Sequence, residues 1–237
     1  INNKTLLEIL INRLKLSKYI SEIVVATTNS NDDNEIIKIC KKININYYKG
    51  DEKNVLKRYY YAAKKFKASE VVRITGDCPL IDHKIVDLVI SKYLLSKVDY
   101  ASNINPPSFP DGMDVEIFSI EVLKKINKKK LQPHHKEHVT TFIRKSNNFK
   151  KLNIKYYKDF SKLRLCVDYE EDLVLLEKIL KRFKFKNNFS LKSILNFMKK
   201  NPELKKLNNK FERNEGQLLS KGQKLWSKAK KIIPGGT

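Results

Sequence analysis

The sequence predicts an α/β fold with a mostly parallel central sheet and helices on both of its faces. Short apolar runs alternate along the chain with longer segments in which apolar residues recur at helical spacing. Strands that alternate with helices of this length are typical of βαβ units. The 237 residues, of which 41% are hydrophobic, suffice for one sizeable domain with appendages.

The first part of the chain alternates strands with helices whose starts carry capping residues. Thr5 precedes a stripe of leucine and isoleucine at helical spacing, and Asp82 stands in the same way before a later helix. The run Glu22–Thr28 has a continuous apolar middle, which is typical of a strand buried on both faces. The elements expected here are helix 5–16, strand 22–28, helix 32–43, strand 44–48, helix 54–66, strand 71–75 and helix 82–95.

The second part of the chain begins with a loop, residues 103–112, that contains three prolines and Gly112. Residues 113–118 alternate in polarity like a half-buried strand, and Ser119 is placed to cap the next helix. We also expect strand 98–102, helix 135–145, an edge strand at 149–157, strand 164–168, and helices 170–183 and 191–199.

The chain divides into three expected parts. Residues 1–200 form the α/β domain, residues 201–213 form a polar linker, and residues 214–237 form an amphipathic helix that stops at Pro234. Because the chain begins at Ile1 and ends as a glycine-rich turn opens, we expect a fragment of a longer protein.

The formal charge of +23 suggests a polyanion such as nucleic acid as a partner. However, the lysines lie mostly on the polar faces of helical patterns and are not interleaved with exposed aromatic residues. Asparagine, isoleucine and tyrosine are also abundant, as in proteins from AT-rich genomes. We therefore attribute the charge to composition, and expect small anionic substrates such as nucleotides rather than nucleic acid.

Neither a membrane nor an oxidising compartment is indicated. No apolar run approaches the roughly 18–20 residues that span a bilayer, so we expect no membrane partner. The three cysteines, Cys40, Cys78 and Cys166, are scattered without a paired motif, which fits the reducing cytoplasm.

Two aspartates stand directly after predicted strands. Asp77 follows Gly76 directly after the run "VVRIT", and Asp168 follows the run "RLCV". A simple turn in which Asp77 accepts backbone N–H groups explains the first equally well. Ligands of such sheets bind beyond the carboxyl ends of the strands, where two carboxylates suit Mg²⁺ beside nucleotide phosphates. This pairing requires that the segments ending at Thr75 and Val167 lie near each other.

Three further groups of polar residues are candidates for substrate contact. His134, Glu137 and His138 fit the H-x-x-E-H zinc pattern literally, but Pro133 places them at a helix start, where Glu137 and His138 face either a polar substrate or solvent. The turn and strand "FPDGMDVEIF" brings Asp111, Asp114 and Glu116 together, where they either form an ordinary turn or accept bonds from sugar hydroxyls.

The third group consists of Asn54 and Arg58, which lie one helical turn apart. A solvated first turn of a helix explains them without any ligand. Contact with a base or a phosphate is the functional alternative.

Five ordered motifs resemble the spore coat polysaccharide biosynthesis-type cytidylyltransferases. They are "GDEKNVLKRYYYAAKKF", "VVRITGDCPLID", "FPDGMDVEIFS", "KEHVTTFIRK" and "LCVDYEEDL", and the resemblance covers residues 4–185. This family is similar to the CMP-KDO and acylneuraminate cytidylyltransferases. The resemblance implies a Rossmann-like, GT-A-type nucleotidyltransferase fold and transfer of CMP from CTP to an acidic sugar, nonulosonic or KDO-like, with release of pyrophosphate.

The resemblance also implies residue roles. Asp77 and Asp168 are implied as Mg²⁺ ligands, and Arg73 as a catalytic contact to phosphate. Gly76, Asn54 and Arg58 are implied on the nucleotide side. The acceptor side is implied to contain Asp111, Asp114, Glu116, Glu137 and His138. A homodimer is compatible with this assignment.

Two departures from the family pattern affect these expectations. The basic, glycine- or serine-containing loop that wraps the triphosphate lies before the position of Ile1, so we expect this chain to lack part of the CTP site. Glu170 stands where the family usually has proline, which bears on the start of a helix rather than on chemistry.

The tail resembles the first helix of a class III aminotransferase of the glutamate-1-semialdehyde aminomutase type. We therefore expect a fusion whose pyridoxal phosphate (PLP) lysine lies beyond Thr237, so PLP is expected only in that second domain. A plain amphipathic helix is the alternative for residues 214–237.

Two other function classes remain open at the level of the sequence. A GT-A-like glycosyltransferase would use a related sheet with acidic metal ligands, although Gly76-Asp77-Cys78 replaces the D-x-D motif expected there. A non-catalytic basic domain would bind RNA or a partner protein, with an affinity that falls steeply with salt.

Overall fold

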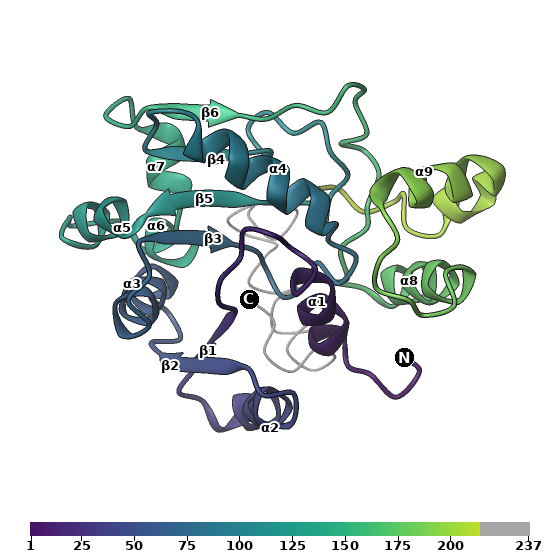
Figure 1. Cartoon of the computed structure of the whole chain (residues 1–237), viewed down its shortest axis with the longest axis horizontal. Helices are drawn as coiled ribbons and strands as arrows, with labels where there is room; N and C mark the ends of the chain where they lie inside the picture. The colour runs from purple at the N-terminus through teal and green to yellow at the C-terminus, as the bar shows by residue number, and fades with distance from the viewer. Residues whose placement is uncertain (214–237) are drawn as a thin grey trace.

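The computed structural model describes residues 1–213, and Figure 1 shows how their elements are arranged. The expected helix at 214–237, assigned by resemblance to an aminotransferase, lies outside the described residues. No helix in the described part of the chain is long and apolar enough to cross a membrane.

Helices and strands alternate along most of the chain, as the sequence predicts. The helices are α1 (Leu6–Leu14), α2 (Asn34–Lys42), α3 (Val55–Lys65), α4 (His83–Leu94), α5 (Ile120–Asn127), α6 (Pro133–Glu137), α7 (Thr141–Lys145), α8 (Glu170–Arg182) and α9 (Leu191–Lys200), with 3₁₀ turns η1 (Asn31–Asp33) and η2 (Pro202–Lys206). The strands are β1 (Val24–Thr28), β2 (Asn46–Gly50), β3 (Glu70–Arg73), β4 (Tyr100–Ser102), β5 (Glu116–Ser119) and β6 (Lys151–Asn153).

The strands form one parallel pair and one mixed sheet, where the sequence predicted a mostly parallel central sheet. β1 and β2 pair in parallel, and a second sheet has the order β3-β5-β4-β6. In it β5 runs antiparallel to both β3 and β4, whereas β4 and β6 are parallel. The reason is the connection between β4 and β5, a loop without the crossover helix that a parallel return requires. β6 lies at the edge, as expected.

Helices cover both faces of the larger sheet, as predicted (Figure 1). Neighbouring residues of β5 point to opposite faces and enter different cores. Ile117 belongs to the core formed with α1, α4, α8 and α9, whereas Phe118 belongs to the core formed with α3, α5 and α7. Period-two alternation along a short buried strand thus joins two hydrophobic cores.

Capping residues begin the helices where the sequence indicated. Thr5 and Glu8 form a capping box at α1, and Ser119 accepts from the Val122 N–H at the start of α5. Asp82 accepts from the N–H of Lys84 in α4 and also from the N–H of Leu191 in α9. One carboxylate therefore fixes the starts of two helices.

A buried arginine holds the turn that follows Asp77. Arg13 of α1 is fully buried and donates from Nε to the carbonyl of Ile81 at 2.8 Å, and from Nη2 to the carbonyl of Leu80. Burial lowers the pKa of Arg13 to about 10. Helix α1 thereby fixes the loop that carries Asp77.

Two expected elements differ in the structure. The expected helix 135–145 is divided into α6 and α7, because the chain turns at Val139, where φ is 27°, and Thr140 donates its hydroxyl to Glu116. The expected strand 164–168 is no regular strand, since only a single bridge, Asp111 to Arg164, joins its start to a neighbour. Local polarity patterns carry no signal for such long-range contacts.

The segment 201–213, predicted as a linker, is packed against the domain. Leu204 is buried, and Asn208 donates to the carbonyl of Arg164 at 3.2 Å and to Asp172 at 2.7 Å. The ring of Phe211 stacks on Tyr169 with 3.8 Å between centroids. This segment therefore runs beside the loop that carries Asp168.

Candidate active site

Asp77 and Asp168 come from distant parts of the chain and lie in adjacent segments. The N–H of Val167 donates to the carbonyl of Asp77 at 2.8 Å. The side chains are close enough for the charge of Asp168 to raise the pKa of Asp77. The requirement that the segments ending at Thr75 and Val167 meet is therefore fulfilled.

Burial and mutual repulsion shape the ionisation of these carboxyl groups. Burial, with the neighbouring charges of Asp168 and Asp111, raises the pKa of Asp77 to about 6. Burial raises the pKa of Asp168 although Arg164 opposes the shift, and raises the pKa of Asp114 to about 7 against the effect of Arg213. Positive charge near this cluster would favour the ionised forms.

Two arginines hold the acidic cluster in place. Arg164 donates from Nε to Asp172 at 3.0 Å, from Nη1 to Asp111 at 3.4 Å, and from Nη2 to Asp168. Arg213 donates to Asp114 and, at 3.0 Å, to the carbonyl of Phe109. The sequence reasoning did not identify either arginine, because Arg213 and the contact of Arg164 with Asp111 join residues more than fifty positions apart along the chain.

A glycine brings the loop of Asp111 against the segment of Asp168. Gly112 has φ +90°, and a Cβ added there would lie 2.6 Å from the main-chain nitrogen of Cys166. The N–H of Asp111 donates to the carbonyl of Leu163 at 2.9 Å, and the N–H of Leu165 donates back to Asp111 at 2.8 Å. Only glycine allows this approach, which sets the spacing of the carboxylates.

The donor set fits a hard divalent cation that has only a few protein ligands. Within residues 1–213, no group of three or more histidine, cysteine, aspartate or glutamate side chains is arranged to hold a metal ion. Mg²⁺ commonly takes one or two carboxylates and completes its coordination with water and phosphate oxygens. Two partly exposed carboxylates that repel each other, Asp77 and Asp168, suit that mode.

Glu116, which the resemblance implied on the acceptor side, is buried among hydrogen-bond donors. Arg73 donates from Nη1 to Glu116 Oε2 at 2.5 Å, whereas Tyr100 and Thr140 both donate to Oε1. Burial acts to raise the pKa of Glu116, but Arg73 and these donors outweigh it, and the net shift is downward. Arg73 also lies over the ring of Tyr59 at 6.0 Å.

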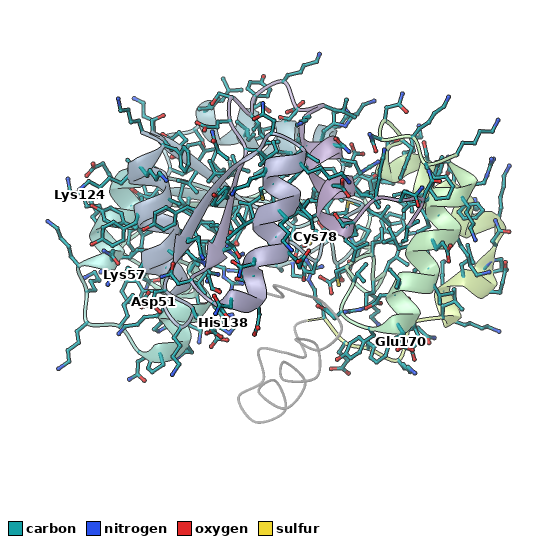
Figure 2. The ribbon with its side chains drawn as sticks, turned by 90° about the horizontal axis from the view of Figure 1, so that it is seen from below. Asp51, Lys57, Cys78, Lys124, His138 and Glu170 are labelled. Carbon is teal, nitrogen blue, oxygen red and sulfur yellow. The ribbon has the colours of Figure 1, made fainter. Side chains whose placement is uncertain are left out.

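Glu137 and His138 lie at the end of α6 rather than at a helix start. Glu137 is the last residue of α6 and is exposed, and half-buried His138 follows it. Burial lowers the pKa of His138; Glu137 opposes this shift, and Arg73 and Arg144 add to it. In the view of Figure 2, His138 lies on the same lower side of the molecule as Asp51 and Lys57.

A hollow of about 560 Å³ lies at the carboxyl ends of β1 and β2. Arg58 is buried beside it and donates to the carbonyl of Asp51 at 3.2 Å, while Asn54 caps α3 by accepting from the Lys57 N–H. The lining residues are Asn29, Tyr48, Lys49, Gly50, Asp51, Glu52, Lys57, Arg58 and Tyr61. The sequence indicated only Arg58 of this set, although the turn after a strand at Gly50-Asp51 was a usable signal.

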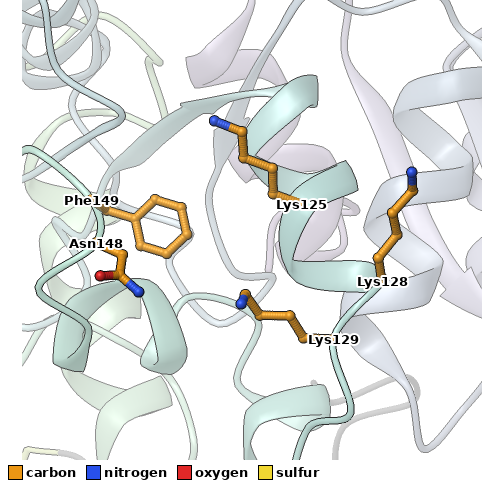
Figure 3. A pocket seen from close by; sticks show the side chains of 5 residues that line it. All are labelled: Lys125, Lys128, Lys129, Asn148 and Phe149. Atoms are coloured by element: carbon orange, nitrogen blue, oxygen red, sulfur yellow. The ribbon is translucent and has the colours of Figure 1, made fainter.

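A second hollow, of about 460 Å³, lies apart from these residues (Figure 3). Lys125 of α5 lines it, together with Lys128 and Lys129 just after that helix and with Asn148 and Phe149. The N–H of Ile120 donates to the carbonyl of Ser69, so α5 starts beside the first residue of β3. Asp77 follows the other end of that strand. None of the residues that line this hollow belongs to the candidate active site.

The family described as "Cytidylyltransferase" matches residues 1–221 of the chain. The chain belongs to the cytidylyltransferase family. Two similar proteins are known by name. The uncharacterized protein MJ1063 of Methanocaldococcus jannaschii is 34% identical over 211 residues, which cover 88% of this chain and 85% of that protein. The spore coat polysaccharide biosynthesis protein SpsF of Bacillus subtilis is 24% identical over 213 residues, which cover 86% of this chain and 87% of that protein.

Solved structures agree with the fold of this cytidylyltransferase. A cytidylyltransferase from Leptospira borgpetersenii superposes with a TM-score of 0.82 at 33% identity, covering 85% of this chain and 86% of that one. A CMP-2-keto-3-deoxy-manno-octonic acid synthetase complexed with CTP gives a TM-score of 0.53 at 12% identity, and the match covers 76% of this chain and 88% of that one. The second likeness concerns the fold alone. The predicted α/β nucleotidyltransferase fold is confirmed.

Proposed function

We propose that this cytidylyltransferase transfers CMP from CTP to a hydroxyl group of an acidic sugar, nonulosonic or KDO-like, and releases pyrophosphate. We assign the reaction to surface polysaccharide biosynthesis in the cytoplasm. The adjacency of Asp77 and Asp168 carries the proposal, because it supplies two carboxylates at the ligand edge of the sheet. The family membership and the name of the SpsF relative support it.

Mg²⁺ is the cofactor of the proposal, and Asp77 and Asp168 are its proposed ligands. When bound, the ion neutralises charge on the phosphates of CTP. The carboxylates fit it because they are close to one another and both have raised pKa values, which a bound cation would lower again.

The side chains of this chain bind and orient the two reactants. The hollow beside Arg58 is the proposed place of the nucleoside, and Asn54 keeps the first turn of α3 in place beneath it. Gly76 has no atom within 4 Å of an added Cβ, which leaves room for phosphate to approach the backbone. Asp111 and Asp114 accept bonds from acceptor hydroxyls, and holding the reactants in line supplies much of the rate.

The proposal is tested by pyrophosphate release from CTP with Mg²⁺ and either KDO or N-acetylneuraminate, using the full-length gene product. We expect release that depends on both substrates and disappears when EDTA removes Mg²⁺. Asp77→Asn should lower the rate at least about 100-fold, since it removes a charged metal ligand. Asp32→Asn, at an exposed carboxylate, is the matched control and should retain activity. A folded full-length protein that releases no pyrophosphate with any acidic sugar contradicts the proposal.

A further inference from the structure

The segment 207–213 joins two parts of the acidic cluster. Near its start, Asn208 donates to Asp172 at 2.7 Å, in the first turn of α8. At its end, Arg213 donates to Asp114, in the loop between β4 and β5. That loop and α8 are distant along the chain, so the segment ties together parts of the site that only tertiary contacts bring near each other.

The guanidinium group of Arg213 contacts both ends of the loop 109–114. Its Nη1 donates to the carbonyl of Phe109 at 3.0 Å, and its Nη2 donates to Asp114. Its Nε lies 3.8 Å from Oδ1 of Asp111, and its side chain is only 13% exposed. The planar fork of arginine suits contacts divided in this way, whereas the single ammonium group of lysine does not reproduce them.

Stacked rings fix the middle of the segment. The ring of Phe211 stacks on that of Tyr169 with 3.8 Å between centroids, and the guanidinium group of Arg164 lies over these rings at 5.9 and 5.4 Å respectively. Arg164 in turn binds Asp111 and Asp168. The aromatic pair therefore anchors the segment beside the arginine that joins those two carboxylates.

Anchoring of the segment does not require Arg213, because Asn208 and Phe211 already attach it to α8 and to the residue before that helix. Among residues 1–213, Arg213 is the only cationic side chain that forms an ion pair with Asp114. Without it, this carboxylate would face like charges with no cation beside it. Repulsion from the neighbouring carboxylates would then push the loop away from the rest of the cluster.

We propose that Arg213 is a positioning residue of the transfer reaction. It holds the loop 109–114 against the segment of Asp168, so that Asp111 and Asp114 keep a fixed place relative to the metal ligands. This inference rests on the proposed function. Because Arg213 acts through carboxylates and not on the nucleotide, its replacement should slow the reaction without weakening the binding of CTP.

The test measures pyrophosphate release by the full-length gene product with CTP, Mg²⁺ and either KDO or N-acetylneuraminate. Arg213→Gln should lower kcat/KM for the acceptor about 10- to 100-fold, the range of one charge-assisted bond, and leave KM for CTP unchanged. Arg213→Lys keeps the charge but not the fork and should fall between them. Arg182→Gln, the same substitution at an exposed arginine that ends α8, is the control and should behave like wild type.

Chemical rescue distinguishes positioning from a loss of stability. Arg213→Ala leaves space for a free guanidinium ion, so about 20 mM guanidinium chloride, far below denaturing concentrations, should restore part of its rate. The same concentration of sodium chloride should not. Wild-type kcat/KM in Arg213→Gln, a raised KM for CTP, or no rescue of a variant that melts like wild type overturns the inference and leaves the reaction standing.

Hydrogen exchange judges the inference even if wild type releases no pyrophosphate with either acceptor, the outcome in which the reaction proposal fails. Amides of residues 109–114 and 163–168 should then exchange faster in Arg213→Gln than in wild type, while those of α4 stay unchanged. Faster exchange confined to these two stretches supports the holding role of Arg213 for a different acceptor. Equal exchange in the two proteins overturns it.

Discussion

Gly112→Ala probes the contact that sets the spacing of the acidic cluster. The new Cβ would lie 2.6 Å from main-chain atoms of Leu165 and Cys166, and it would be added at φ +90°. Strain at a positive φ costs about 1–2 kcal/mol. The loop must also move away, which weakens the two bonds between Asp111 and residues 163–165, each worth about 1 kcal/mol. We expect a loss of about 2–4 kcal/mol in the free energy of unfolding.

The assay is urea unfolding followed by circular dichroism. At a slope of about 2 kcal/mol per M, the midpoint should fall by about 1–2 M urea. Gly76→Ala is the matched control, because nothing lies within 4 Å of its added Cβ and its φ is not positive. It should keep the midpoint but lose turnover, since its methyl group would occupy the space proposed for phosphate. A Gly112→Ala midpoint equal to that of wild type refutes the reasoning.

Three further predictions concern buried ionisable side chains. Glu116→Gln should destabilise the fold by about 3–5 kcal/mol in thermal unfolding, because Arg73, whose side chain is only 20% exposed, loses its carboxylate partner; a loss below about 1 kcal/mol argues against this role. Burial opposes ionisation of Asp33, but bonds from Thr27 and Thr28 lower its pKa below 3.8. Ionised Asp33 therefore stabilises the fold above about pH 4, and this stabilisation is lost as pH falls through the lowered pKa. The free energies of unfolding of Asp33→Asn and wild type should accordingly converge in acid and differ at pH 7. Burial raises the pKa of Cys40 to about 11, so iodoacetamide at pH 8 should modify Cys40 only after unfolding; rapid labelling of the native protein contradicts this.

Local sequence patterns were sufficient to predict most helices and strands. Thr5, Asp82 and Ser119 each cap a helix because capping is decided within three or four residues. Strand direction was not predictable in this way. The antiparallel course of β5 depends on how the proline-rich loop turns back, and no period in the sequence encodes that turn.

Local patterns in the sequence likewise indicated only part of the candidate site. Strand-end positions indicated Asp77 and Asp168, and the structure brings their segments together. Arg164 and Arg213 each bind an aspartate more than fifty residues away along the chain, Asp111 and Asp114 respectively. Motif spacing in the sequence does not indicate such contacts. Glu116 was singled out for its polarity, whereas its surroundings show a buried acceptor for Arg73.

The most direct test of the central claim is the rate of CTP-dependent pyrophosphate release in a double-mutant cycle of Asp77→Asn and Asp168→Asn. If both carboxylates hold one cation, either substitution removes the same function, and the double variant should be no slower than the slower single variant. Rate losses that multiply fully in the double variant would contradict a shared site, as would normal turnover in either single variant.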